Sequence, residues 1–189
     1  ADVLKSDIED LLQSGADIPE PTVEATNKNE KNEEKHVLGI EKELFTVATG
    51  EVIDLTDVND PVFSQKMMGD GFAVIPATGE VTAPLSGKIV SVFPTKHAIG
   101  MQTAEGAEVL IHMGLDTVQM SQPAFEILVS EGQEVVAGTT IAQMDLDAIK
   151  NEGKETTIIV VFTDDKVNGL NINKLGDTER GTVIGKINL

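Results

Sequence analysis

The chain has 189 residues, 40% of them hydrophobic, which is enough for one packed domain with a tail. Only 3% are aromatic, so the core must be built from aliphatic side chains and Met. The formal charge of −18 disfavours nucleic acid and anionic surfaces as partners, and the lack of cysteine excludes disulfides and thiolate chemistry. There is no apolar run of membrane-spanning length and no secretory signal, so we expect no direct membrane insertion and a cytoplasmic location.

The N-terminal stretch differs in character from the rest of the chain. Residues 1–15 place apolar side chains at helical spacing and then reach a Ser-Gly pair, which predicts a short helix. Residues 16–40 are rich in Glu, Asn and Lys and cannot bury enough surface to offset the entropy of ordering them. We therefore predict a flexible linker, and we interpret His36 within it as a solvated residue without a role. The missing initiator Met indicates a fragment or a processed chain.

From residue 41 the pattern changes to short β-type runs separated by turn residues. Many short strands at close spacing predict an all-β fold, an antiparallel β-sandwich or barrel with short helical turns. One short helix is expected at Leu146–Glu152. The expected strands are Leu44–Val47, Glu51–Leu55, Phe72–Ile75, Glu80–Ala83, Lys88–Phe93, Gly100–Thr103, Glu108–Met113, Phe125–Val129, Thr139–Met144, Thr156–Phe162 and Thr182–Ile187.

Two histidines lie within this β-rich region. His112 belongs to the run EVLIHMGLDTV, where strand alternation places it on the face opposite Val109 and Ile111. Gly114 then lets the backbone leave the strand with little bulk near the imidazole. His97 lies in the predicted loop FPTKHAIG, two residues after the hydroxyl of Thr95. On spacing alone, each histidine could be structural, a nucleophile or a ligand.

The two histidines are more informative as a pair. A turn at Glu105-Gly106 lies about midway between them, so a hairpin would bring both rings to one face. Neutral imidazole, with a reference pKa of about 6.5, is a usable nucleophile at cytosolic pH. A second imidazole can donate hydrogen bonds to phosphoryl oxygens in the transition state. The pair therefore suits phosphoryl transfer.

Three motifs carry a resemblance to a known family. TKHAIG, EVLIHMGLDTV and GDGFAVIPATGEVTAPLSGKIVSV together resemble the IIA domain of the glucose class of the bacterial phosphoenolpyruvate:sugar phosphotransferase system. The similarity covers roughly residues 44–189 and keeps order and spacing. It implies a phosphocarrier domain at 41–189 that accepts a phosphoryl group from the protein HPr and passes it to a cysteine of a IIB domain. No cofactor and no metal are implied.

The same resemblance assigns roles to individual residues. It implies that His112 accepts the phosphoryl group, and that His97 supports the transfer while Thr95 holds its ring. Asp116 and Asp60 match acidic positions that border the family's site. Two carboxylates there would repel the phosphate, which keeps it transferable, and would pair with a basic group of a partner.

Apolar residues are expected to surround this site. Val62 and Phe63 match an apolar rim that the family uses in docking. We also expect Ile99 and Met113 to exclude water from the site, because hydrolysis would waste the phosphoramidate.

A weaker resemblance concerns the N-terminus. SDIEDLLQSG is similar to the final helix of a glucose-class IIB domain. It implies that residues 1–15 end an upstream IIB-like domain and that the chain is the C-terminal part of a IIC-IIB-IIA subunit. The acceptor cysteine would then lie upstream, and the domain would be tethered to a membrane-embedded IIC domain.

Other interpretations fit parts of the sequence. The segments EVTAPLSGKIVSV and EGQEVVAGTTIAQMD resemble the hairpins of a biotinyl or lipoyl carrier. However, Met144-Asp145 is followed by Leu146 rather than by the lysine that carries the group. A zinc hydrolase could use the His-x-x-x-Asp spacing of His112 and Asp116 as two ligands. A IIA-like domain could also act as a non-catalytic regulator that binds transporters or kinases.

Overall fold

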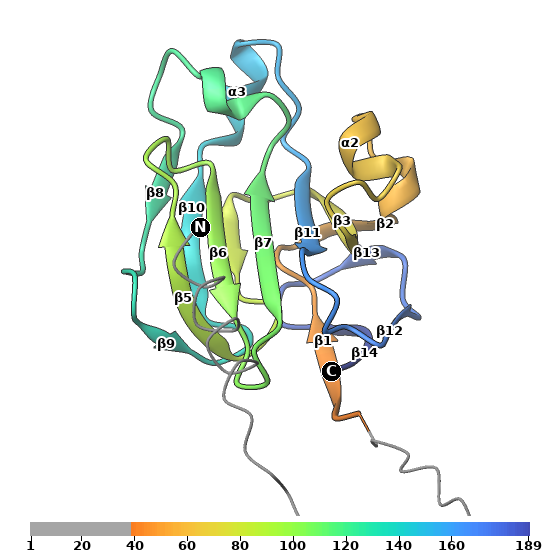
Figure 1. Ribbon diagram of the computed structural model, residues 1–189. Helices are drawn as coiled ribbons and strands as arrows, with labels where there is room; N and C mark the ends of the chain where they lie inside the picture. Colours follow the sequence, from red (N-terminus) through yellow and green to blue (C-terminus); the bar gives the residue numbers. More distant parts are fainter. Residues whose placement is uncertain (1–38) are drawn as a thin grey trace, which may run out of the picture. The chain divides into compact units, whose positions relative to one another are not determined.

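The computed structural model describes residues 39–189. The helix expected at residues 1–15, His36 and nearly all of the predicted linker lie outside the described residues. The rest is an all-β domain, as predicted (Figure 1). Its strands are β1 (Glu41–Phe45), β2 (Gly50–Asp54), β3 (Asp70–Pro76), β4 (Glu80–Thr82), β5 (Gly87–Val92), β6 (Ala98–Gln102), β7 (Glu108–Met113), β8 (Phe125–Ile127), β9 (Glu134–Val135), β10 (Thr140–Met144), β11 (Ile158–Phe162), β12 (Gly169–Ile172), β13 (Gly176–Thr178) and β14 (Val183–Asn188).

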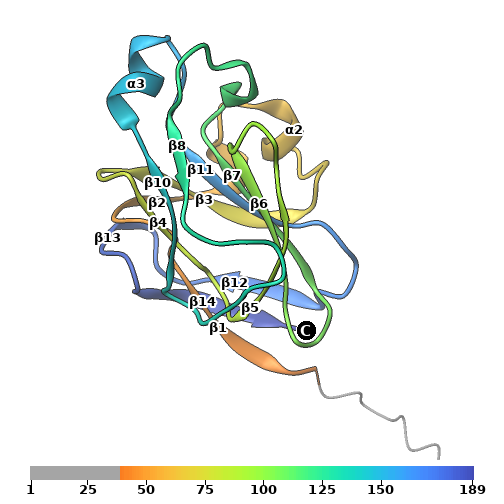
Figure 2. The same cartoon turned by 90° about the vertical axis from the view of Figure 1, so that its left-hand side faces the viewer.

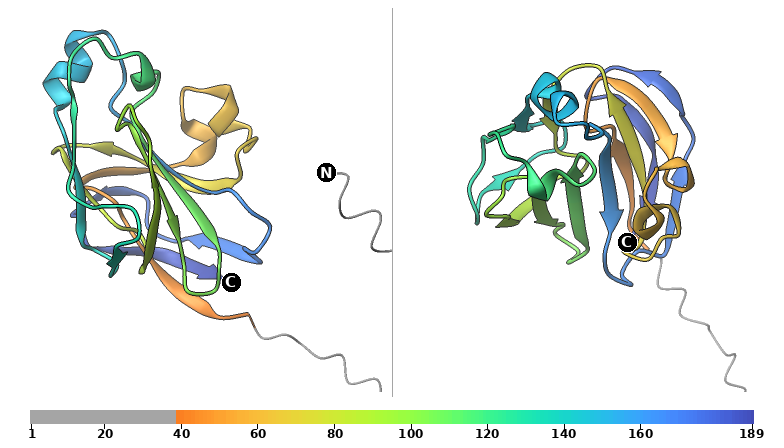
Figure 3. Two further views of the ribbon diagram at one scale, coloured as in Figure 1. Left: turned by 60° about the vertical axis from the view of Figure 1, so that its left-hand side comes forward. Right: turned by 90° about the horizontal axis from the view of Figure 1, so that it is seen from above.

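Four short helical segments connect some of these strands. They are η1 (Leu55–Asp57), α2 (Pro61–Ser64), η2 (Thr117–Gln119) and α3 (Leu146–Asn151). Both α2 and α3 lie at the upper end of the domain in Figure 1, and the view from above in Figure 3 looks onto them.

The strands form three antiparallel sheets. The largest has the order β13-β2-β3-β11-β7-β6-β5-β9, and the two smaller ones have the orders β1-β14-β12 and β4-β10-β8. Figure 2 shows β8 and β10 side by side, with α3 beyond the end of β10. The sheets do not close on themselves, so of the two expected arrangements the sandwich-like one holds.

The main core lies on one face of the large sheet. Strand alternation points Val109, Ile111 and Met113 of β7 into it, together with Ile158 and Val160 of the neighbouring β11. All of these side chains are almost completely buried. Apart from Phe72 and Phe162, the buried members of this core are aliphatic side chains and Met, as the composition predicts.

A second, smaller cluster covers the opposite face of β3, β11 and β7. Leu55 of η1, Phe63 of α2 and Leu115 pack there against Ile159 and Val161 of β11. Because alternate residues of a strand point to opposite faces, this smaller cluster shares its face of β7 with His112. The short helix α2 thus covers one side of that histidine through Phe63.

Each strand expected from the sequence is present; β7 has the expected bounds, and the ends of the others are shifted. The expected helix corresponds to α3. Sequence reasoning missed β9, β12 and β13, which are two to four residues long, and also η1, η2 and α2. Strands this short carry too few residues for a period of two to be visible.

Candidate functional site

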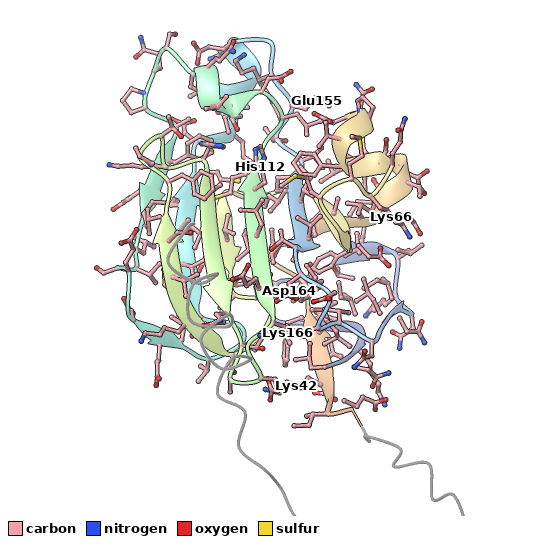
Figure 4. All side chains as sticks on the ribbon, in the orientation of Figure 1. Lys42, Lys66, His112, Glu155, Asp164 and Lys166 are labelled. Carbon is pink, nitrogen blue, oxygen red and sulfur yellow. The ribbon has the colours of Figure 1, made fainter. Side chains whose placement is uncertain are left out.

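His112 lies near the end of β7, on the face that bears the smaller cluster (Figure 4). Its side chain is partly buried, and its Nδ1 lies 2.8 Å from the carbonyl oxygen of Gly114. A carbonyl oxygen only accepts, so Nδ1 carries the proton and donates it. In the neutral ring this leaves the lone pair on Nε2, which makes Nε2 the nucleophilic atom.

The turn after β7 fixes this hydrogen bond. Gly114 has φ of 81°, a left-handed conformation that glycine adopts without strain. The hydroxyl of Thr117 closes the turn by donating to the carbonyl oxygen of Met113 at 2.6 Å. The Gly114 carbonyl therefore has a defined direction, and the imidazole of His112 takes its orientation from it.

His97 lies beside His112, as the predicted hairpin requires. Strands β6 and β7 pair with Ala98 opposite His112, and the carbonyl of His97 accepts from the backbone N–H of Met113 at 2.7 Å. The two imidazole centroids are 4.9 Å apart and the ring planes meet at 78°. The expectation that both rings meet on one face is therefore confirmed.

The ring of His97 is held on two sides. The hydroxyl of Thr95 forms a hydrogen bond with its Nδ1, as the resemblance implied. The ring of Phe93 meets it edge to face, with centroids 5.6 Å apart. His97 itself is only 6% exposed, so its ring has little freedom to turn. Sequence reasoning had not singled out Phe93; its place directly before the Pro-Thr-Lys-His turn was the signal available.

Helix α2 brings two further predicted residues to His112. Asp60 caps the helix, since its Oδ1 accepts from the N–H of Val62 at 2.9 Å. Three residues later, the ring of Phe63 packs on His112 with centroids 5.2 Å apart. Phe63 is only 7% exposed, whereas Val62 is 41% exposed. Val62 can thus belong to a docking rim, while Phe63 instead forms a wall of the site.

The other predicted carboxylate belongs to the turn after β7. Asp116 is exposed, has φ of 58° and makes no capping hydrogen bond with its side chain. Both Asp116 and Asp60 lie close enough to His112 to raise its pKa through their charges. The structure therefore brings the five predicted residues together, with Thr95, Asp60 and Asp116 near the two imidazoles.

Burial keeps both imidazoles neutral. The pKa of His112 is lowered because the protein desolvates its ring, although the Gly114 carbonyl and the two carboxylates oppose this. The pKa of His97 is lowered by burial and, to a smaller extent, by the charge of the neighbouring His112. At neutral pH the site thus presents two uncharged rings.

One expectation about this site is wrong. Ile99 and Met113 are completely buried in the main core, on the opposite face of the sheet from His112. They cannot exclude water from the imidazoles, because the sheet itself lies between. The ring of Phe63 takes that place on His112. The error came from treating sequence neighbours of a histidine as its spatial neighbours.

Two absences apply to the described part of the chain. Residues 39–189 hold no group of three His, Cys, Asp or Glu side chains arranged to bind a metal ion, so the ligand set expected of a zinc hydrolase is not found there. No helix within these residues is both long and apolar enough to cross a bilayer.

Comparison with known proteins identifies the family. Residues 42–167 match the family described as phosphoenolpyruvate-dependent sugar phosphotransferase system, EIIA 1. The chain belongs to this family. Its members transfer phosphoryl groups, and membership supports a phosphocarrier role in sugar phosphotransfer. The resemblance drawn from the three motifs is confirmed, and the biotinyl or lipoyl carrier finds no support.

Individual relatives agree with this EIIA assignment. The chain is 46% identical over its whole length to the PTS system glucose-specific EIICBA component of Streptococcus pneumoniae, of which it spans 26%. It is 45% identical over 130 residues to a PTS system glucose-specific EIIA component of Staphylococcus aureus, covering 68% of this chain and 78% of that one. The solved structure of glucose permease IIA from Mycoplasma capricolum superimposes with a TM-score of 0.73 at 38% identity, over 78% of this chain and 96% of that chain.

Proposed function

We propose that His112 accepts a phosphoryl group from phospho-HPr on Nε2 and passes it to a cysteine of a IIB domain. The observation that carries this proposal is the pair of imidazoles 4.9 Å apart, with Nδ1 of His112 hydrogen-bonded to the Gly114 carbonyl. We further propose that the domain works in the cytoplasm, tethered through residues 16–40 to IIB and IIC parts like those named in the EIICBA relatives.

The first transfer needs no proton from this protein. The lone pair of Nε2 attacks the phosphorus atom of phospho-HPr, the bond from that phosphorus to HPr breaks, and the electron pair of this bond stays with HPr. Throughout, Nδ1 of His112 keeps its proton in the hydrogen bond to Gly114. In the second transfer a thiolate of IIB attacks the same phosphorus, and the Nε2–P bond breaks.

His97 supports the transfer to IIB as a hydrogen-bond donor. When the hydroxyl of Thr95 donates to Nδ1 of His97, the ring proton resides on Nε2. That N–H can then donate to an oxygen of the phosphoryl group carried by the neighbouring His112. Because His97 is buried, this donor is already oriented before the phosphoryl group arrives.

The carboxylates act on charge at the mouth of the site. Asp60 and Asp116 repel the phosphate once it is on His112, which keeps the group from being held too tightly. They also offer partners for basic groups of HPr or IIB. Val62 and Val118, each two residues after one of these carboxylates in the sequence, have exposed side chains that can provide apolar contact to a partner.

Phosphorylation with labelled phosphoenolpyruvate, enzyme I and HPr tests the proposal. We expect label on the wild type and none on His112→Ala, with His36→Ala as a matched control that keeps full labelling. His97→Gln should still accept label but should transfer it poorly to IIB. Removal of residues 1–39 should leave labelling within about tenfold of the intact chain. Label that persists on His112→Ala would refute the proposal.

A further inference from the structure

Three non-glycine residues between 39 and 189 have a left-handed backbone. They are Lys66 with φ of 57°, Lys96 with φ of 60° and Asp116 with φ of 58°. This conformation is unfavourable for residues with a Cβ and persists only where the surroundings impose it. Each lies in one of the three segments that build the site: the end of α2, the turn before β6 and the turn after β7.

Lys96 lies between Thr95 and His97, whose side chains form a hydrogen bond. Its backbone N–H donates to the carbonyl of Phe93 at 2.8 Å, which closes a tight turn. The next residue, His97, is anchored through its carbonyl to Met113 of β7. Thr95 and His97 are thus fixed on either side of Lys96, and the left-handed backbone lets the hydroxyl of Thr95 reach Nδ1 of His97.

The side chain of Lys96 has a different environment from its backbone. Lys96 is exposed, whereas the ring of His97 beside it is buried. Among the described residues, none of the salt bridges involves Lys96. The fold therefore constrains the backbone conformation of Lys96 and makes no visible use of its ammonium group.

We propose that Lys96 is a positioning residue whose left-handed backbone holds the Thr95 hydroxyl on Nδ1 of His97. This keeps the proton of the His97 ring on Nε2, where it faces the phosphoryl group on His112. The inference rests on the function proposed above, and it assigns the effect to the backbone of Lys96 and not to its charge.

Four substitutions separate backbone from charge, because all of them remove the ammonium group. Lys96→Gly and Lys96→Asn introduce residues that favour the left-handed conformation. Lys96→Gln leaves the conformational cost of that backbone unchanged, and Lys96→Val raises it because valine is branched at Cβ. We expect the Gly, Asn and Gln variants to transfer phosphoryl groups to IIB at the wild-type rate within about twofold. Lys96→Val should lose about tenfold or more in that rate while still accepting label from HPr.

A spectroscopic readout tests the contact without any phosphotransfer. The ¹H–¹⁵N correlations of the His97 ring report which nitrogen holds the proton. Lys96→Val should change them as Thr95→Ala does, and the other three variants should not. This readout stays valid even where the wild type takes no label, so failure of the proposed function and of this inference are distinguishable.

Two results would overturn the inference. Equal losses of transfer in all four variants would assign the effect to the charge of Lys96. Unchanged transfer and unchanged His97 signals in Lys96→Val would show that the left-handed backbone does not control the contact. Should Lys96→Val fail to fold, Lys96→Gly still decides, because a loss of transfer or an altered His97 signal in that variant contradicts a backbone role.

Discussion

Replacing Gly114 by Ala should both destabilise the domain and disturb its nucleophile. Gly114 has φ of 81°, so any residue with a Cβ pays about 1–2 kcal/mol to keep that conformation. A Cβ there would overlap the methyl group of Thr117 and lie 2.9 Å from the carbonyl oxygen of Glu155. Turning Thr117 away breaks its buried hydrogen bond to Met113, at about 1–3 kcal/mol. The expected loss in the free energy of unfolding is therefore about 3 kcal/mol.

A matched control separates the strain from the overlap. Gly132 has φ of 88°, and a Cβ added there meets nothing within 4 Å, so Gly132→Ala should lose only about 1 kcal/mol. In urea unfolding, with a slope of about 2 kcal/mol per molar, the midpoints should fall by about 1.5 M and 0.5 M respectively.

The functional consequence of Gly114→Ala can be measured on the same proteins. The substitution moves the carbonyl that orients His112, so labelling by HPr should slow by about tenfold or more in Gly114→Ala and stay unchanged in Gly132→Ala. Equal midpoints for the two variants, with normal labelling of both, would refute the assignment of a tight, orienting turn after β7.

Three further predictions concern the charge beside His112, the cap of α2 and the pH dependence of stability. Asp116→Asn should lower the pKa of His112 further, because the carboxylate opposes burial; an NMR titration with an unchanged or raised pKa would contradict this. Asp60→Ala should lose about 1 kcal/mol of unfolding free energy relative to Asp60→Asn, which keeps the helix cap; indistinguishable urea midpoints would contradict it. In the folded protein the pKa of both His97 and His112 lies below the reference value of about 6.5. The neutral rings therefore contribute their full stability above pH 6.5, and this stability is lost as the pH falls through the folded pKa. A variant with Gln at both positions should show a shallower decline in unfolding free energy between pH 7 and 5, and an identical decline would argue against it.

The sequence was most informative where a periodic pattern and a turn coincided. The strand with His112 and the turn at Glu105-Gly106 predicted the hairpin, and the structure pairs Ala98 with His112 as that hairpin requires. Alternation also predicted that His112 faces away from Val109 and Ile111. The same alternation places Met113 in the core, so the expectation that it shields the site contradicted the pattern itself.

Other features of the site depend on contacts between distant segments. The four-residue helix α2 is too short to show a period, yet it brings Asp60 and Phe63 to a histidine about fifty residues further along the chain. The left-handed backbone of Lys96 carries no sequence signal, since lysine is not a residue that favours it. Local propensity could not identify such features, because tertiary packing imposes them.

The arrangement of protons explains how the proposed chemistry can take place in a largely dry site. Because the Nδ1 proton of His112 is held by the Gly114 carbonyl, Nε2 carries no proton when it attacks, so accepting the phosphoryl group needs no general base. Burial lowers the pKa of His112 and so disfavours the protonated ring, which keeps the Nε2 lone pair available for attack on phosphorus. Because Nδ1 keeps its proton when Nε2 bonds to phosphorus, the ring of phosphorylated His112 carries a formal positive charge beside the anionic phosphate. The adjacent ring of His97 offers an N–H to the phosphate, while Asp60 and Asp116 oppose the phosphate's charge. A site with these opposing contributions can hold the group without trapping it, which a carrier between two partners requires.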